Sequence, residues 1–173
     1  MQRLKEILLK KHSKQYYCHI QFVVEIALRL CKKLNADREI VEIAAMLHDI
    51  GRDNEINGET HYEAGKRIAN KILSNTNINN IKKEKILQCI VNHDGKEEPS
   101  FLEESIIITA DAGSKVEFHE AFILMCKKES YKEKLNWGQK YLEQGFSRIK
   151  IDSYLNEITK KYQELKSIYA KIK

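Results

Sequence analysis

The chain has 173 residues, enough to bury a hydrophobic core without disulfide bonds or a structural metal. It contains a single proline and seven glycines among many lysines, glutamates, isoleucines and leucines, which favours helices over a sheet of short strands. The net charge of +5 comes from scattered lysines without a long basic block or interleaved aromatic residues, so no clear nucleic-acid site is predicted.

No apolar run approaches the roughly 20 residues that a membrane-spanning helix needs, and the first residues lack the apolar core of a signal peptide. The four cysteines are widely spaced and include no CxxC pair, so we expect them to be buried residues without a ligand role rather than a zinc site. These features predict a cytoplasmic protein that does not enter a membrane.

Helical periodicity begins near the start of the chain. Apolar residues on one face predict a short helix over 3–11, and a clean amphipathic stripe predicts a second helix over 15–34. His19 lies one turn before a stripe position, so its ring should point toward the core. The next helix, 38–50, is apolar over much of its circumference, as expected for a central buried helix, and Gly51 should end it.

Three further helices are predicted in the middle of the chain. Thr60 and Glu63 form a capping-box pattern that begins a helix over 61–73. A polar connector then leads to a helix over 81–93. The run 101–113 contains three consecutive isoleucines that could form a buried strand, but no partner strand is evident elsewhere, so we predict a helix.

The last third of the chain is also helical in pattern. The helix that contains Asp111 should continue through the apolar residues up to Met125, and another helix should cover 131–145 with Trp137, the only tryptophan. Asp152 can cap a long amphipathic helix that ends the chain.

Together these elements predict an all-α fold, a compact bundle of about seven to nine helices that ends in a long amphipathic helix. No repeat or linker divides the chain, so residues 1–173 should form a single domain. Its motif-bearing core should span about 15–120, followed by C-terminal helices over 121–173. We expect the last helix to cover this core rather than to serve as a dimerisation arm, and the oligomeric state stays open.

The stretch His48-Asp49-Ile50-Gly51 places an imidazole next to a carboxylate at the end of an apolar helix. An unpaired carboxylate is costly in such a place, so the pair calls for a counter-charge, of which a divalent metal is the strongest. The other residues that could share this metal are His19, His61, His93 and Asp111. Imidazole and carboxylate ligands suit Mn, Fe, Co, Ni or Zn, and Mg is a further candidate.

The order of these residues resembles that of a known superfamily. His19, then His48-Asp49 in the form HDIG, then Asp111 within Thr109-Ala110-Asp111-Ala112-Gly113, is similar to the HD-domain metal-dependent phosphohydrolases over residues from about 15 to 120. This resemblance implies a compact all-α fold with metal ligands at His19, His48, Asp49 and Asp111. It also implies hydrolysis of phosphate esters or anhydrides, commonly of nucleotides.

One branch of that superfamily carries two extra histidines and binds two metal ions. His61 and His93 stand in the matching places, which implies a dinuclear site bridged by Asp49. Many relatives have a second histidine directly after the position of His93, whereas this chain has Asp94. Asp94 could be a ligand, a support behind the ligands (the role we favour) or a helix terminator. With one metal ion instead, His61 and His93 would face the substrate.

Two cations are candidates for binding a phosphate group. Arg52 directly follows HDIG and its planar fork can hold a phosphate with two hydrogen bonds, although it could instead pair with Asp53 or Glu55. Lys115 lies one helical turn past the last predicted ligand, although it could be solvated.

We predict Asp49, Arg52 and Lys115 as catalytic residues and Arg52, Lys115 and Asp94 as substrate-binding residues. His12 and His119 match no position of the superfamily and are expected to be bystanders.

The leading interpretation is a metal-dependent phosphohydrolase that acts through a metal-activated water on a small phosphate compound, such as a nucleotide. A phosphomonoesterase, a phosphodiesterase and a pyrophosphohydrolase are all compatible with the motif. The alternative is a non-catalytic HD domain that senses a nucleotide or binds a partner, and the intact ligand set argues against it.

Overall fold

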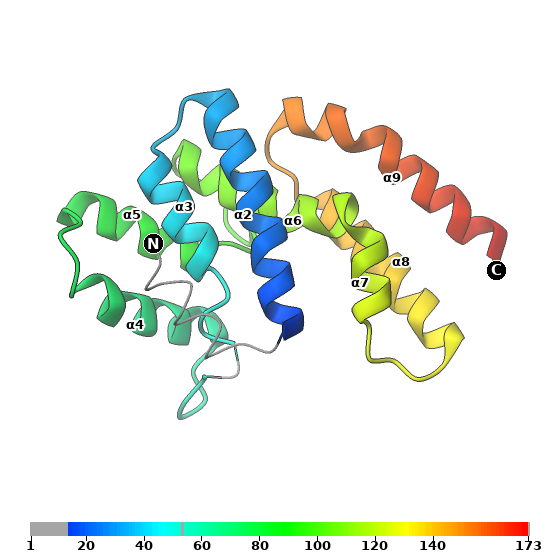
Figure 1. Ribbon diagram of the computed structural model, residues 1–173, viewed down its shortest axis with the longest axis horizontal. Coiled ribbons are helices and arrows are strands. Elements are labelled where there is room, and N and C mark those ends of the chain that lie inside the picture. The colour runs from blue at the N-terminus through cyan, green and yellow to red at the C-terminus, as the bar shows by residue number, and fades with distance from the viewer. Residues whose placement is uncertain (1–13, 53, 173) are drawn as a thin grey trace.

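Figure 1 shows the computed structural model, which describes residues 14–52 and 54–172. These residues form eight helices and no strand, which confirms the predicted all-α fold. The helices are α2 (Lys14–Leu34), α3 (Arg38–Leu47), α4 (His61–Leu73), α5 (Asn80–Val91), α6 (Leu102–Glu117), α7 (His119–Met125), α8 (Tyr131–Ser147) and α9 (Asp152–Ile172). The predicted helix over 3–11 and His12 lie outside the described residues.

The centre of the molecule is a three-helix contact. α2 packs against both α3 and α6, and α3 is buried along most of its length, as its apolar sequence predicts. α4 and α5 pack together on one side of this centre, whereas α7, α8 and α9 lie on the other side (Figure 1). The functional side chains therefore sit between two groups of helices.

Capping residues begin the helices where the sequence places them. Asp37 accepts hydrogen bonds from the first backbone N–H groups of α3, and Thr60 and Glu63 form the predicted capping box of α4. Asn35 adopts a positive φ of 53° after α2, as its predicted role at the helix end requires.

The central helix ends earlier than predicted. α3 stops at Leu47, and residues 48–52 continue in hydrogen-bonded turns. The reason is the close contact of Gly51 with α4, since a Cβ atom on Gly51 would lie 2.0 Å from the carbonyl oxygen of His61 and 2.4 Å from the backbone nitrogen of Gly65. Only glycine allows the two backbones to approach in this way.

α5 is also shorter than predicted, because it ends at Val91 and leaves His93 in a turn. The side chain of Asn92 explains this end. Its amide donates to the carbonyl oxygen of Glu97 at 3.0 Å and accepts from the backbone N–H of the same residue at 3.0 Å, which folds the chain back on itself.

The expected continuous helix beyond Asp111 is wrong, because Phe118 separates α6 from α7. The Nζ atom of Lys161 on α9 donates to the carbonyl oxygen of Glu117 at 2.6 Å and so satisfies a carbonyl group at the helix end. The ring of Phe118 stacks on Phe22 of α2 with ring centroids 4.2 Å apart. The break turns α7 toward α8.

The C-terminal helix covers the core, as predicted. α9 buries Tyr154, Ile158, Leu165 and Tyr169, whereas Ile168 is half exposed. His119 joins this helix to α6, since its ring bonds the carbonyl oxygen of Lys115 at 3.0 Å and the hydroxyl of Tyr169 at 2.7 Å. Among the described helices, none is both long and apolar enough to cross a bilayer.

Candidate metal centre

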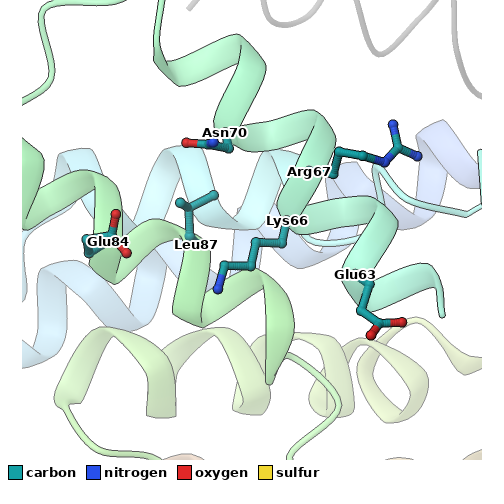
Figure 2. Close-up of a pocket in the computed structure, with 6 residues that line it drawn as sticks. All are labelled: Glu63, Lys66, Arg67, Asn70, Glu84 and Leu87. Atoms are coloured by element: carbon teal, nitrogen blue, oxygen red, sulfur yellow. The ribbon is translucent and has the colours of Figure 1, made fainter. Parts of the chain in front are cut away.

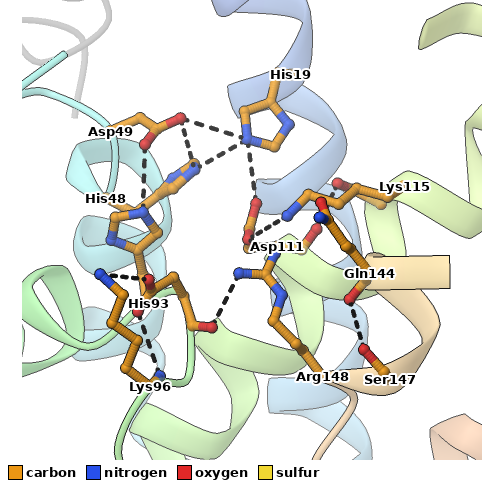
Figure 3. Close-up of polar contacts among 12 residues, drawn as sticks. His19, His48, Asp49, His93, Lys96, Asp111, Lys115, Gln144, Ser147 and Arg148 are labelled. Carbon is orange, nitrogen blue, oxygen red and sulfur yellow. Dashed lines mark hydrogen bonds and ion pairs between the residues drawn. The ribbon is translucent and has the colours of Figure 1, made fainter. Parts of the chain in front are cut away.

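The six predicted metal ligands converge from five separate segments of the chain. His19 comes from α2, His48 and Asp49 from the turn after α3, His61 from the start of α4, His93 from the turn after α5, and Asp111 from α6. They form two groups, and within each group the ligand atoms lie within 4.8 Å of one another. The first group is His19, His48 and Asp111, and the second is Asp49, His61 and His93. Figure 3 shows five of these side chains turned toward a common centre.

All of these residues are buried except His61, which is partly exposed. The two early helix ends described above are what place His48, Asp49 and His93 in turns rather than on helix faces. The backbone can therefore aim three neighbouring side chains into one volume.

The tautomers of two histidines are fixed by the backbone. The Nδ1–H of His48 donates to the carbonyl oxygen of Ala45 at 2.8 Å, and the Nδ1–H of His93 donates to the carbonyl oxygen of Ile90 at 2.7 Å. When either ring is neutral, its lone pair therefore lies on Nε2, which faces the centre. A backbone acceptor behind the ring is the arrangement that orients a metal-binding histidine.

The carboxylate of Asp49 lies between these lone pairs. Its Oδ2 atom is 3.6 Å from Nε2 of both His19 and His48, and its Oδ1 atom is 3.3 Å from Nε2 of His93. Oδ1 of Asp111 lies 3.3 Å from Nε2 of His19. Lone pairs and carboxylate oxygens repel one another at these distances unless a cation lies among them.

A divalent metal fits this donor set. The Nε2 atom of His61 is buried without a hydrogen-bond partner among the described residues, although Asp49 and His93 of the same group offer metal-ligating atoms nearby. Imidazole nitrogen and carboxylate oxygen suit first-row cations. The described residues could therefore hold a metal through either group, with Asp49 turning one oxygen toward each.

The protonation states suit metal binding. Burial would raise the pKa of Asp49, but His48 and His93 beside it hold that pKa well below its usual range. Burial would likewise raise the pKa of Asp111, which Lys115 and a neighbouring histidine hold well below its usual range. Burial lowers the pKa of His48 to about 4, so its ring is neutral near neutral pH. Charged carboxylates and a neutral imidazole are the forms that bind a metal.

Both predicted cations lie beside the ligands. The Nε atom of Arg52 donates to Oδ1 of Asp49 at 2.6 Å, and its side chain is 37% exposed, so the guanidinium also reaches solvent. Lys115 is buried rather than solvated, and its Nζ donates to Oδ2 of Asp111 at 2.8 Å. Burial lowers the pKa of Lys115, and the nearby Asp111 carboxylate offsets part of this effect. The alternative partner Asp53 lies outside the described residues.

Asp94 stands behind the ligands. Its carboxylate accepts a hydrogen bond from the hydroxyl of Tyr62, whose ring centroid lies 3.7 Å from that of His61 and 5.3 Å from that of His93. Asp94 belongs to neither ligand group and is not among the residues that line the pocket beside the centre, so its contact with a substrate stays a prediction. Through Tyr62, it supports two histidine rings.

The family model described as "HD domain" matches residues 16–115, more than half of the chain, and this range contains all six predicted ligands. The chain belongs to the HD-domain family. The predicted resemblance is thereby confirmed.

Other proteins resemble this HD domain over different lengths. An uncharacterized protein of Clostridium beijerinckii is 27% identical over 129 residues, 74% of each chain. A tRNA (cytidine(56)-2'-O)-methyltransferase of Thermoplasma volcanium is 39% identical over 64 residues, 36% of this chain, which spans only about a fifth (19%) of that enzyme's length. The solved structure of a predicted HD superfamily hydrolase from an uncultured Thermotogales bacterium superposes with a TM-score of 0.63 at 19% identity, covering 95% of this chain and 91% of the other.

One residue beside the centre of this HD domain gave no sequence signal. Arg148 follows α8, where its Nη2 atom donates to Oδ2 of Asp111 at 3.1 Å and its Nη1 atom to the carbonyl oxygen of Asp94 at 2.9 Å (Figure 3). It lies 37 positions past Asp111 and outside the matched range, among other basic residues. Only the folded chain shows that it touches a ligand.

A pocket of about 560 Å³ opens beside the metal-ligating residues. It is lined by His19, Asp49, Arg52, Asp111, Lys115, Phe122, Met125, Cys126, Lys127, Lys128, Trp137 and Tyr141. The volume falls in the range of small-molecule sites, roughly 300–1,000 Å³. The wall formed by α7, α8 and their connection lies outside residues 16–115.

Proposed function

We propose that this HD domain is a metal-dependent phosphohydrolase that cleaves a phosphate ester or anhydride of a small molecule, such as a nucleotide. The observation that carries the proposal is the position of Asp49. Its two oxygens face different histidines, and it is buried at the end of a pocket that also presents cations. Such a carboxylate can bridge two metal ions, which the two ligand groups would share.

The two ions divide the ligands between them in this proposal. His19, His48 and Asp111 would hold the first ion and His61 and His93 the second, with Asp49 on both. Bound in this way, divalent ions would lower the pKa of a water ligand from about 16 toward about 7 and so would supply hydroxide near neutral pH. The family match and the converging donor atoms support this assignment.

The residues of the chain supply positioning and charge. Arg52 donates to Asp49 through Nε, and its partly exposed guanidinium lines the pocket, where it can hold phosphate oxygens. Lys115 and Arg148 both donate to Oδ2 of Asp111, which leaves Oδ1 turned toward His19. These two cations therefore orient a ligand, and Lys115 additionally faces the pocket.

The proposal is tested by reconstitution. Metal-free protein is loaded in turn with Mn, Fe, Co, Ni, Zn or Mg and assayed against nucleotides, dinucleoside polyphosphates and an aryl phosphate. We expect turnover with at least one cation, and release of phosphate or of a nucleotide identifies the bond that is cleaved. Turnover with none of them would contradict the proposal. Nucleotide binding by calorimetry without turnover would instead support the non-catalytic alternative.

A further inference from the structure

The pocket beside the metal-ligating residues has an aromatic wall that starts at a ligand and leads away from it. The ring of His19 lies edge-on to Phe122 with centroids 5.6 Å apart, and Phe122 lies edge-on to Tyr141 at 5.1 Å. Tyr141 stacks on Trp137 at 4.7 Å with an angle of 18° between the ring planes. All four residues line the pocket.

Trp137 and Tyr141 owe this arrangement to helix geometry. They stand four residues apart on α8, which places their rings on the same face of the helix. Trp137 is only partly buried, so its indole belongs to the pocket rather than to the core. A tryptophan in the core would be shielded from water more completely than one on a pocket wall. The position of Trp137 on the wall therefore indicates a role in binding.

Four cationic side chains line the same pocket. Arg52 and Lys115 lie at the metal end, and the Nζ atom of Lys115 is 5.5 Å from the ring centroid of Tyr141, where the charged and aromatic parts meet. Lys127 and Lys128, which follow α7, also line the pocket. A compound with a phosphate group at one end and a flat ring at the other matches this distribution.

A second groove of the molecule lacks these features. It lies between α4 and α5, has a volume of about 310 Å³ and is lined by Glu63, Lys66, Arg67, Asn70, Glu84 and Leu87 (Figure 2). Both signs of charge are present and no lining residue is aromatic. The combination of cations and stacked rings therefore distinguishes the pocket at the metal-ligating residues.

We infer that α7 and α8 form a ring-binding wall, on which the nucleobase of a nucleotide stacks against the Trp137–Tyr141 pair while its phosphate lies at Arg52. The inference rests on the proposed function and adds to it the part of the substrate that is recognised. The wall lies outside the matched range 16–115, so it is a property of this chain and not of the shared core. Stacking on an aromatic side chain tolerates every base, since each base has a π-face.

Trp137 is the only tryptophan of the chain, so its fluorescence reports on the wall directly. The full-length protein, both metal-free and loaded with Zn, is titrated with AMP, GMP, CMP and UMP, and separately with ribose 5-phosphate. We expect saturable quenching by nucleotides and none by ribose 5-phosphate, which has the sugar and phosphate but no base. The inference is overturned if no nucleotide quenches the fluorescence or if ribose 5-phosphate quenches it equally.

Kinetics give a second test. We expect Trp137→Leu to raise KM for nucleotides by roughly tenfold to a hundredfold and to raise KM for ribose 5-phosphate or inorganic pyrophosphate by much less. Trp137→Phe keeps a ring and should lose less. The matched control is Tyr131→Leu on the same helix, since Tyr131 is 67% exposed and lines a different cleft. An equal loss for substrates with and without a base would overturn the inference.

The two readouts separate the inference from the proposed function. Quenching by nucleotides without turnover of any phosphate compound would retain the wall and reject the phosphohydrolase. Turnover of base-free phosphates without quenching would retain the phosphohydrolase and reject the wall. If Trp137→Leu does not fold, as judged by circular dichroism, the titration of the unmodified protein decides.

Discussion

Nε2 of His93 lies 3.3 Å from Oδ1 of Asp49, while the Nδ1–H of the same ring donates to the carbonyl oxygen of Ile90. His48 repeats this arrangement on the other oxygen, with Ala45 as its backbone acceptor. Burial lowers the pKa of His48 to about 4, so this neutral ring turns a lone pair toward a negative charge, which is unfavourable without a cation between them. The fold therefore favours the binding of a cation beside Asp49.

The first prediction concerns that charge. Asp49→Asn keeps the shape of the side chain and removes its negative charge, so the metal content should fall. Turnover should drop by more than about 100-fold, which exceeds the loss typical of residues that only support a metal ligand. Elemental analysis and the reconstitution assay measure both effects. The control is Asp94→Asn, because Asp94 bonds Tyr62 and belongs to neither ligand group. Full metal content in Asp49→Asn would refute the assignment of Asp49 as a ligand.

The second prediction concerns the number of ions. His61 belongs only to the group that would hold the second ion, and its Nε2 atom has no hydrogen-bond partner among the described residues. His61→Asn should therefore reduce the metal content from about two equivalents per chain to about one. Elemental analysis of the purified variant, compared with the unmodified protein, measures this. An unchanged stoichiometry would give His61 a role toward the substrate instead.

The third prediction tests Arg148 as a positioning residue. Arg148→Met removes the hydrogen bonds to Oδ2 of Asp111 and to the carbonyl oxygen of Asp94, so kcat should fall by about 10- to 100-fold with little change in KM. Arg148→Lys should recover little, since an ammonium group does not reproduce the fork that reaches both acceptors. Lys150→Met is the control, because Lys150 pairs with the exposed Glu98. A change in KM alone would place Arg148 on the substrate.

The sequence predicted the parts of the fold that depend on local chemistry. The capping box at Thr60 and Glu63 placed the start of α4, and the resemblance pointed to histidines and aspartates that the fold brings together in two groups. Gly51 was predicted to end the helical run, but the earlier end of α3 at Leu47 could not be predicted, because it depends on the close approach of Gly51 to the backbone of α4. A helix boundary set by another helix leaves no mark in its own periodicity.

Contacts between distant residues account for the other differences. Arg148 reaches Asp111 across 37 positions, and Tyr169 meets His119 across 50 positions, without a motif that links them. The aromatic wall likewise depends on how α7 and α8 fold back onto α6, which the break at Phe118 makes possible. A single sequence shows which residues could act, whereas the fold shows which of them meet.

The last prediction concerns stability at a distance from the pocket. Arg29 of α2 donates two hydrogen bonds to the carboxylate of Glu117, at 2.9 and 2.5 Å, and the hydroxyl of Tyr154 on α9 donates a third at 2.8 Å. Burial would raise the pKa of Glu117, but the bonds from Arg29 and Tyr154 outweigh it and lower that pKa below the model-compound value of 4.5. The charged form of Glu117 thus joins three helices.

A lowered pKa in the folded state makes this contribution pH-dependent. It is fully present above the unfolded pKa of 4.5 and is lost as the pH falls through the lower folded value. Glu117→Gln should therefore reduce the free energy of unfolding by about 1–3 kcal/mol near neutral pH, and this difference should shrink as the pH falls below 4.5. Urea denaturation of metal-free protein across this pH range measures it, with Glu120→Gln as the control, since Glu120 is 63% exposed in its pair with Lys161. Protonation weakens the bonds between Glu117 and Arg29 in the unmodified protein, whereas a glutamine does not titrate. A difference that stays constant with pH would therefore mean that the charge of Glu117 does not stabilise the fold.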